Sequence, residues 1–72
     1  RSPLAGLTPR QREVLQLVVR GQSVKAIARQ LALSVKTVEM HRAQVMQRLD
    51  VREVADLVRF AIRHGLLPLE VD

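Results

Sequence analysis

Apolar residues recur every three to four positions in four stretches of this chain, with polar residues between them. This period is that of amphipathic helices, each of which turns one apolar face towards a core. No stretch alternates as a strand does, and there is no internal repeat or low-complexity tract. The pattern therefore predicts an all-α fold, a compact four-helix domain. The expected helices span residues 9–20, 24–31, 35–49 and 52–64.

The first helix has a strong start signal. Thr8 is the expected cap, Pro9 occupies the first helical position, where its missing N–H costs nothing, and Gln11 can complete a capping box. Gly21 is expected to end this helix. Residues 1–7 hold a proline and a glycine and have no periodicity, so we expect them to be the end of a linker.

Two short amphipathic helices follow, separated by about three residues. Ser23 and Ser34 are their expected caps. The apolar residues of the second of these helices, from Val38 to Leu49, recur at helical spacing and mark its buried stripe. Two helices joined so tightly are typical of a helix-turn-helix, whose second helix can enter the major groove of DNA. We therefore interpret residues 34–49 as a recognition helix.

A fourth helix is predicted from about Arg52 to His64. Asp50 is expected to close the preceding helix in the left-handed conformation, and Gly65 to end the fourth. The apolar face of the fourth helix is broader than one core contact needs. Part of it could form a two-fold dimer seam, although a wholly intradomain core is an equal alternative. The candidate seam residues are Ala55, Val58 and Ile62.

Charge is unevenly spread along the 72 residues, whose net charge is +5. Residues 1–49 hold nine Lys or Arg against two Glu, which gives +7. Residues 50–72 hold three Arg against five acidic residues, which gives −2. A basic front and a mildly acidic back suit a one-sided contact with a polyanion. A basic surface that is merely solvated is the equal alternative on charge alone.

Composition excludes several classes of function. Phe60 is the single aromatic residue, which argues against aromatic platforms for stacking nucleic-acid bases. With no cysteine there is no disulfide or thiolate metal site. No phosphate loop, metal cluster or nucleophile–base pair is present, so we expect no enzyme, cofactor or metal. No apolar run approaches the roughly 20 residues of a membrane span and no signal peptide is visible, so we expect a cytoplasmic protein.

A series of landmarks at fixed spacing carries a family resemblance. The landmarks are Leu7-Thr8-Pro9-Arg10, Glu13-Val14-Leu15, Gly21, Ile27-Ala28, Leu31, Ser34, Thr37-Val38, His41 and Leu49. Through them, the chain from Leu7 to about Leu66 resembles the LuxR-type helix-turn-helix domain of NarL- and FixJ-type response regulators and of quorum-sensing regulators. The block TVEMHR is most similar to the FixJ branch. Two positions depart from common members, Glu39 where many have Lys and Asp50 where many have Gly.

The resemblance implies a DNA-binding domain over residues 8–67, between the linker end at 1–7 and a tail at 68–72. Such domains bind double-stranded DNA as dimers, with the third helix in the major groove and the fourth helix at the homodimer contact. In the full-length protein a regulatory N-terminal domain, either a receiver or a ligand-binding domain, would control it. RNA polymerase is a further candidate partner.

Four residues on the outer side of the third helix are candidates for contacts to DNA bases. Glu39 could accept from a cytosine N4 amine, and Met40 or Ala43 could pack on a thymine methyl group. Glu39 could instead form an ion pair with Lys36 or Arg42, and Ala43 could be present only because it favours a helix. The base candidates are Lys36, Glu39, Met40 and Ala43.

Other polar residues are candidates for contacts to DNA phosphates, because cations and helix starts both attract anions. For each isolated cation a solvated charge is the alternative. His41 is expected at the edge of the core, donating to a phosphate or a backbone carbonyl; a metal site is disfavoured because His64 is the only other histidine. Glu13 is expected to pair with an arginine such as Arg42. The phosphate candidates are Ser23, Lys25, Ser34, Thr37, His41, Arg42 and Arg48.

The expected function is sequence-specific binding of double-stranded DNA, as the output domain of a bacterial transcription regulator. One rival is a sigma-factor promoter-reading domain, which shares the LTPRxREVL opening and a helix-turn-helix. The block Thr37–Arg42 and the fourth helix favour the regulator. A rival of another class is a helical protein-interaction module that uses the fourth helix.

Overall fold

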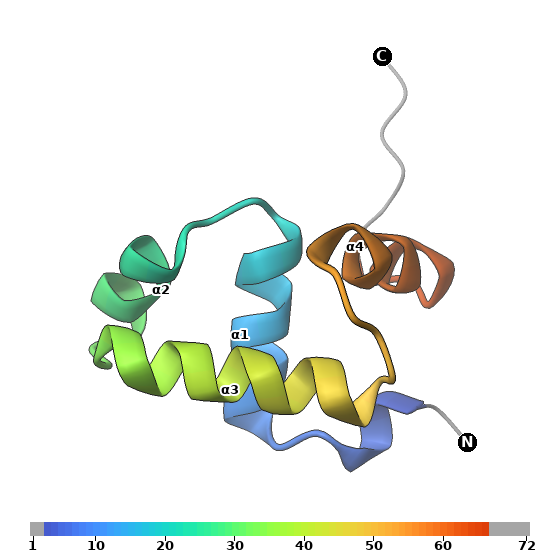
Figure 1. Cartoon of the computed structure of the whole chain (residues 1–72), viewed down its shortest axis with the longest axis horizontal. Helices are drawn as coiled ribbons and strands as arrows, with labels where there is room; N and C mark the ends of the chain where they lie inside the picture. Colours follow the sequence, from blue (N-terminus) through green and yellow to red (C-terminus); the bar gives the residue numbers. More distant parts are fainter. Residues whose placement is uncertain (1–2, 67–72) are drawn as a thin grey trace.

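Four α-helices follow a single 3-10 turn in the computed structural model, which describes residues 3–66 (Figure 1). The described residues contain no strand, and the predicted four-helix, all-α fold is confirmed. No helix among them is long and apolar enough to cross a membrane. The elements are η1 (Pro3–Gly6), α1 (Pro9–Val19), α2 (Val24–Leu31), α3 (Val35–Arg48) and α4 (Val54–Arg63).

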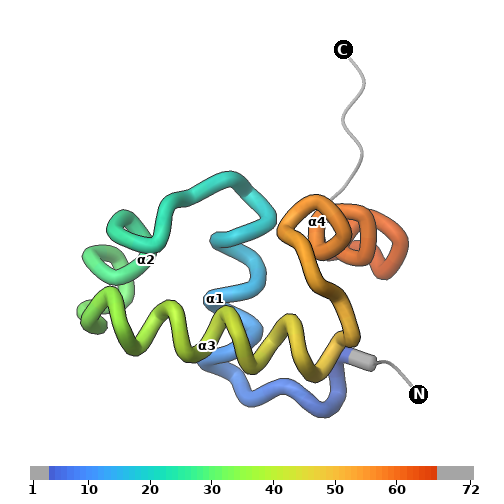
Figure 2. Tube along the Cα trace, in the orientation of Figure 1, coloured from blue at the N-terminus to red at the C-terminus, as the bar shows by residue number. Residues whose placement is uncertain are grey.

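Helix α1 is the centre of the domain. It packs against α2, α3 and α4, while α2 also packs against α3 (Figures 1 and 2). Every helix turns at least one fully buried apolar side chain into the shared core, which explains why helices as short as α2 are stable here. The largest fully buried side chains are those of Leu15, Ile27, Leu57, Val14, Val38 and Val45.

Three of the four helices begin at a hydroxyl cap. Thr8, Ser23 and Ser34 each accept a hydrogen bond from the backbone N–H three residues further on. The predicted capping box is confirmed, since the Thr8 N–H also donates to Oε1 of Gln11 at 3.0 Å. Helix α4 has no side-chain cap, and because Glu53 is extended it begins two residues later than predicted.

All four helices end in a left-handed residue. In each case the next N–H donates to the carbonyl five residues earlier, as Leu33 does to Ala28 at 2.9 Å. The prediction for Asp50 is confirmed, and Ala32 takes the same conformation in the turn between α2 and α3. The left-handed residues and their φ angles are Gly21 (89°), Ala32 (56°), Asp50 (57°) and Gly65 (78°).

The segment before α1 is folded, and the prediction of a linker there is wrong for residues 3–7. Leu4 and Leu7 are buried in the core. Arg12 donates to the Leu4 carbonyl at 2.9 Å, and Nη1 of Arg48 donates to the Gly6 carbonyl at 2.7 Å. Side chains from α1 and α3 therefore hold this turn on the domain, beside the end of α3 (Figure 1). The predicted tail, residues 68–72, lies outside the described residues.

Candidate nucleic-acid interface

The outer side of α3 is exposed along its length. Val38 and Val45, which are 0% and 1% exposed, face the core from the opposite side of the helix. Met40 is 49% exposed, although contact with water does not stabilise an apolar side chain. We call the four base candidates the outward row, and all four of its residues are exposed: Lys36, Glu39, Met40 and Ala43.

The carboxylate of Glu39 has no ion-pair partner within residues 3–66. The alternative of an intrahelical pair with Lys36 or Arg42 is therefore not realised there. The two ion pairs of the described residues are Arg10–Glu13, at 3.2 Å, and Asp56–Arg59, at 2.9 Å. Glu13 pairs with an arginine as expected, but its partner is Arg10, one turn away on the same helix, and not Arg42.

Two hydroxyl groups at the start of α3 are joined by a hydrogen bond. Ser34 accepts from the Thr37 N–H at 3.0 Å and donates its own proton to Oγ1 of Thr37 at 2.8 Å. This arrangement leaves the Thr37 proton free to donate outwards. Ser23 caps α2 by accepting from the Ala26 N–H at 3.1 Å, and Lys25 is exposed in the first turn of that helix. Both helix starts therefore offer donors to an anion.

The remaining phosphate candidates differ in their surroundings. His41 is half-buried, and its Nδ1 is buried without a hydrogen-bond partner among the described residues, so the expected bond to a backbone carbonyl is not formed there. Arg42 is half-buried and Arg48 is exposed. Arg48 already donates to the Gly6 carbonyl, a partner that the sequence did not predict, and its other N–H groups stay available.

The apolar face of α4 extends beyond the core. Leu57 and Ala61 are fully buried, whereas Ile62 is 37% exposed. The domain's own core therefore covers Ile62 only in part. Ala55 is also exposed and Val58 is half-buried, so the three seam candidates remain accessible in the monomer.

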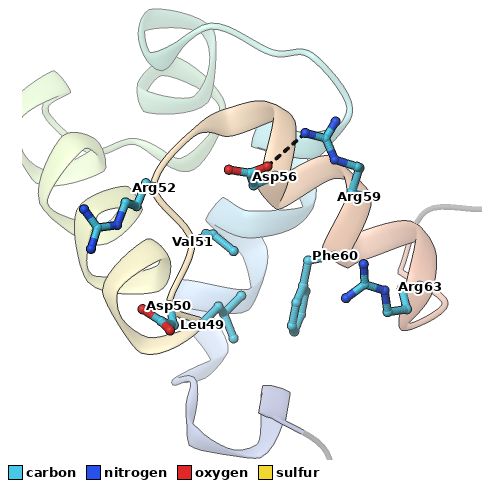
Figure 3. A pocket seen from close by; sticks show the side chains of 8 residues that line it. All are labelled: Leu49, Asp50, Val51, Arg52, Asp56, Arg59, Phe60 and Arg63. Carbon is cyan, nitrogen blue, oxygen red and sulfur yellow. Dashed lines mark hydrogen bonds and ion pairs between the residues drawn. The ribbon is translucent and has the colours of Figure 1, made fainter.

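A polar hollow of about 540 Å³ lies where the end of α3, the following loop and α4 meet (Figure 3). Its charge is mixed, because three arginines and two aspartates line it and Arg59 is paired with Asp56. The Phe60 ring lies among these side chains and contacts the His64 ring, with the ring centroids 4.2 Å apart and the planes tilted by 33°. No group of three His, Cys, Asp or Glu that could hold a metal occurs within residues 3–66.

A second hollow, of about 560 Å³, lies beside the outward row. It is lined by Gln11 at the start of α1 and by Gln44, Gln47 and Arg48 on the second half of α3. We call it the amide hollow. It carries no acidic side chain in its lining, so of the two hollows it suits an anion better.

Comparison with known proteins finds matches among bacterial regulatory proteins. Residues 5–61 match the family model of bacterial regulatory proteins of the luxR family. The chain is 41% identical over 64 residues to the transcriptional regulatory protein FixJ of Bradyrhizobium diazoefficiens, covering 89% of this chain and 31% of that protein. It is 40% identical over 65 residues to the oxygen regulatory protein NreC of Staphylococcus carnosus, covering 90% and 30%.

The fold is also similar to a solved structure. The crystal structure of full-length FixJ from B. japonicum superimposes with a TM-score of 0.82 at 40% sequence identity, covering 90% of this chain and 32% of that one. This chain therefore spans about a third of the length of the relatives that it matches.

Proposed function

The chain belongs to the luxR family of bacterial regulatory proteins, and from that premise we propose that it is the DNA-binding output domain of a transcription regulator. In this proposal α3 lies in the major groove of double-stranded DNA, and two copies bind a palindromic site. The observation that carries the proposal is the outward row, four exposed residues on the second helix of a helix-turn-helix.

Each residue of the outward row has a role that its chemistry supports. The unpaired carboxylate of Glu39 accepts from a cytosine N4 amine, while Met40 and Ala43 contact thymine methyl groups. Lys36 lies one turn before Met40 and donates to a base edge or a phosphate. The polar residues around the row hold the phosphates: Ser23, Lys25, Ser34, Thr37, His41, Arg42 and Arg48.

The rest of the protein is part of the proposal too. Since the relatives are about three times as long, we place a regulatory domain, such as a receiver, before this chain in a cytoplasmic response regulator. RNA polymerase is the partner through which such a domain would act on transcription. A sigma-factor domain is less well supported, because the matched relatives are named as regulatory proteins.

Titration of the 72-residue chain against mixed-sequence duplex DNA tests the proposal. Affinity should fall steeply with salt, because bound Lys and Arg release counterions from the DNA. Lys36→Ala should weaken binding to most sequences and reduce the slope of log K against log salt by about 1. Glu13→Ala on α1 is the control and should leave the slope unchanged. Absence of DNA affinity, or affinity without a salt slope, would contradict the proposal.

A further inference from the structure

A chain of hydrogen bonds joins the start of α1 to the recognition helix. The Thr8 N–H donates to Oε1 of Gln11 at 3.0 Å, and Nε2 of Gln11 donates to Oε1 of Gln44 at 3.0 Å. A backbone N–H can only donate, so Gln11 must turn its oxygen towards Thr8 and its NH2 group towards Gln44. Gln44 must in turn offer its oxygen to Gln11. The helix cap therefore fixes the orientation of an amide on α3.

The outer half of that amide is a hydrogen-bond donor with no protein acceptor among the described residues. Gln11 is 7% exposed, whereas Gln44 is exposed and lines the amide hollow. Within residues 3–66 the NH2 group of Gln44 donates to no protein atom. The chain thus holds this NH2 donor in one orientation at the edge of the proposed DNA-binding helix. No hydrogen bond within the described part of the domain uses it.

We propose that Gln44 is a further DNA-binding residue, which donates its NH2 group to a phosphate of the duplex seated in the amide hollow. The inference rests on the proposed function. The register of the helix supports it, because residues 37, 41, 44 and 48 lie on one flank of α3 next to the outward row. Thr37, His41 and Arg48 are already phosphate candidates, and Gln44 occupies the position between them.

The hydrogen bond that Gln44 accepts from Gln11 makes a phosphate a better partner for its NH2 group than a base. Reading adenine with glutamine requires the amide oxygen and the NH2 group to face the base together, whereas the hydrogen bond from Gln11 holds the oxygen of Gln44 towards α1. A phosphate oxygen needs only the donor. Arg48, on the rim of the same hollow, adds a positive charge that attracts the anion. Because Gln11 holds the amide in place beforehand, less side-chain freedom is lost on binding.

The donor itself is tested by Gln44→Met, which keeps the length of the side chain and has no N–H group. With the 72-residue chain and a mixed-sequence duplex at low salt, Kd should rise about threefold to tenfold. Since Gln44 is neutral, the salt slope should stay that of the parent chain, whereas Lys36→Ala should reduce it. Thermal unfolding of each variant shows whether the fold is kept.

The orientation by Gln11 is tested by Gln11→Glu. A glutamate keeps the acceptor of the capping box, but it cannot donate to Gln44 and would draw the Gln44 NH2 group inwards. The carbonyl oxygen would then face the phosphate, so Kd should rise. The new negative charge also weakens DNA binding. In the Gln44→Met background the donor is absent, so the double variant Gln11→Glu/Gln44→Met measures the effect of this charge on Kd alone. The loss from Gln11→Glu should be about threefold smaller in the Gln44→Met background.

The outcomes separate this inference from the proposed function. If the parent chain binds DNA, Lys36→Ala weakens it and Gln44→Met does not, the role of Gln44 is refuted and the proposed function stands. If Gln11→Glu causes the same loss in the parent chain and in the Gln44→Met background, the orientation by Gln11 is refuted. If the parent chain binds no DNA, the proposed function fails and the inference fails with it.

Discussion

Ala32 holds the most strained backbone conformation among the turns of this domain. Its φ of 56° places the β-carbon close to the following carbonyl, at a cost of about 1–2 kcal/mol. Asp50 has almost the same φ, but aspartate tolerates the left-handed region better, since its short polar side chain can bond locally. Backbone hydrogen bonds across the turn and the half-buried Leu33 offset the cost at Ala32.

Ala32→Gly should therefore stabilise the domain. Relief of the steric cost exceeds the extra entropy that glycine gives the unfolded chain, so we expect the free energy of unfolding to rise by up to about 1 kcal/mol. Asp50→Gly is the matched control and should give a smaller gain. Urea unfolding followed by circular dichroism measures both; a loss of stability at Ala32→Gly would mean that the entropy that glycine adds to the unfolded chain exceeds the relief of the steric cost.

Substitution of Glu39 should change the base preference of the domain without changing its stability. It is exposed and forms no ion pair within residues 3–66, so Glu39→Ala should change the free energy of unfolding by less than about 0.5 kcal/mol. On DNA it should relax the preference at one base pair, by about 1–3 kcal/mol. Binding to a selected site and its single-base variants measures this. An unchanged preference at every position would remove Glu39 from the base contacts.

At the scale of the elements, the sequence predicted what local chemistry determines. The capping box of Thr8 and Gln11 and the glycine ends of α1 and α4 depend on residues within about one turn of each other, so they are visible in the chain. The start of α4 was misplaced because no side chain caps it. The outward row follows from the helical period once Val38 is placed in the core.

Features that depend on distant residues were not predictable in this way. Arg48 meets Gly6 across 42 residues, so the sequence of the first segment alone predicts a linker where the structure has η1. A β-carbon at Gly6 would lie 3.1 Å from Nη1 of Arg48, a close approach that only the fold creates. Gln11 meets Gln44 across 33 residues, and the orientation of that amide has no signature in either segment alone.

Leu4→Ala tests whether the turn before α1 is part of the domain. Leu4 is 8% exposed, so truncation should lower the free energy of unfolding by about 2–3 kcal/mol, through lost apolar burial and the cavity left behind. Val54→Ala is the control, because Val54 is 43% exposed and should cost less than about 0.5 kcal/mol. If Leu4→Ala and Val54→Ala both lower the free energy of unfolding by the same small amount, residues 3–7 belong to a linker and not to the folded domain.

At the scale of the whole molecule, the proposed DNA and dimer surfaces lie on two different helices that pack against the same third helix. Helices α3 and α4 both pack on α1, and the outward row and the seam candidates belong to α3 and α4 respectively (Figure 2). The net charge of residues 1–49 is +7, whereas that of residues 50–72 is −2. DNA would therefore attract the α3 side, and the α4 side would remain free for a second copy.

We expect the proposed seam to be too small to hold a dimer without DNA. Its candidates are three side chains on one helix, Ala55, Val58 and Ile62, whereas a stable interface buries roughly 1,200 Å². On adjacent half-sites the second copy is at a high effective concentration, so even a weak contact should give cooperative binding. We expect a monomer in free solution and a dimer on a site whose halves lie about one helical turn apart.

Ile62→Asp should separate these two states. Ile62 is 37% exposed, so a carboxylate there keeps access to water and the monomer should stay folded. Two facing carboxylates would repel each other across a two-fold axis, so cooperativity on a double site should disappear while affinity for a single half-site stays within about twofold. Arg63→Gln, off the seam on the same helix, should keep the cooperativity. If Ile62→Asp binds the double site as cooperatively as the parent chain, α4 is not the dimer contact, and the pairing must come from elsewhere in the longer protein.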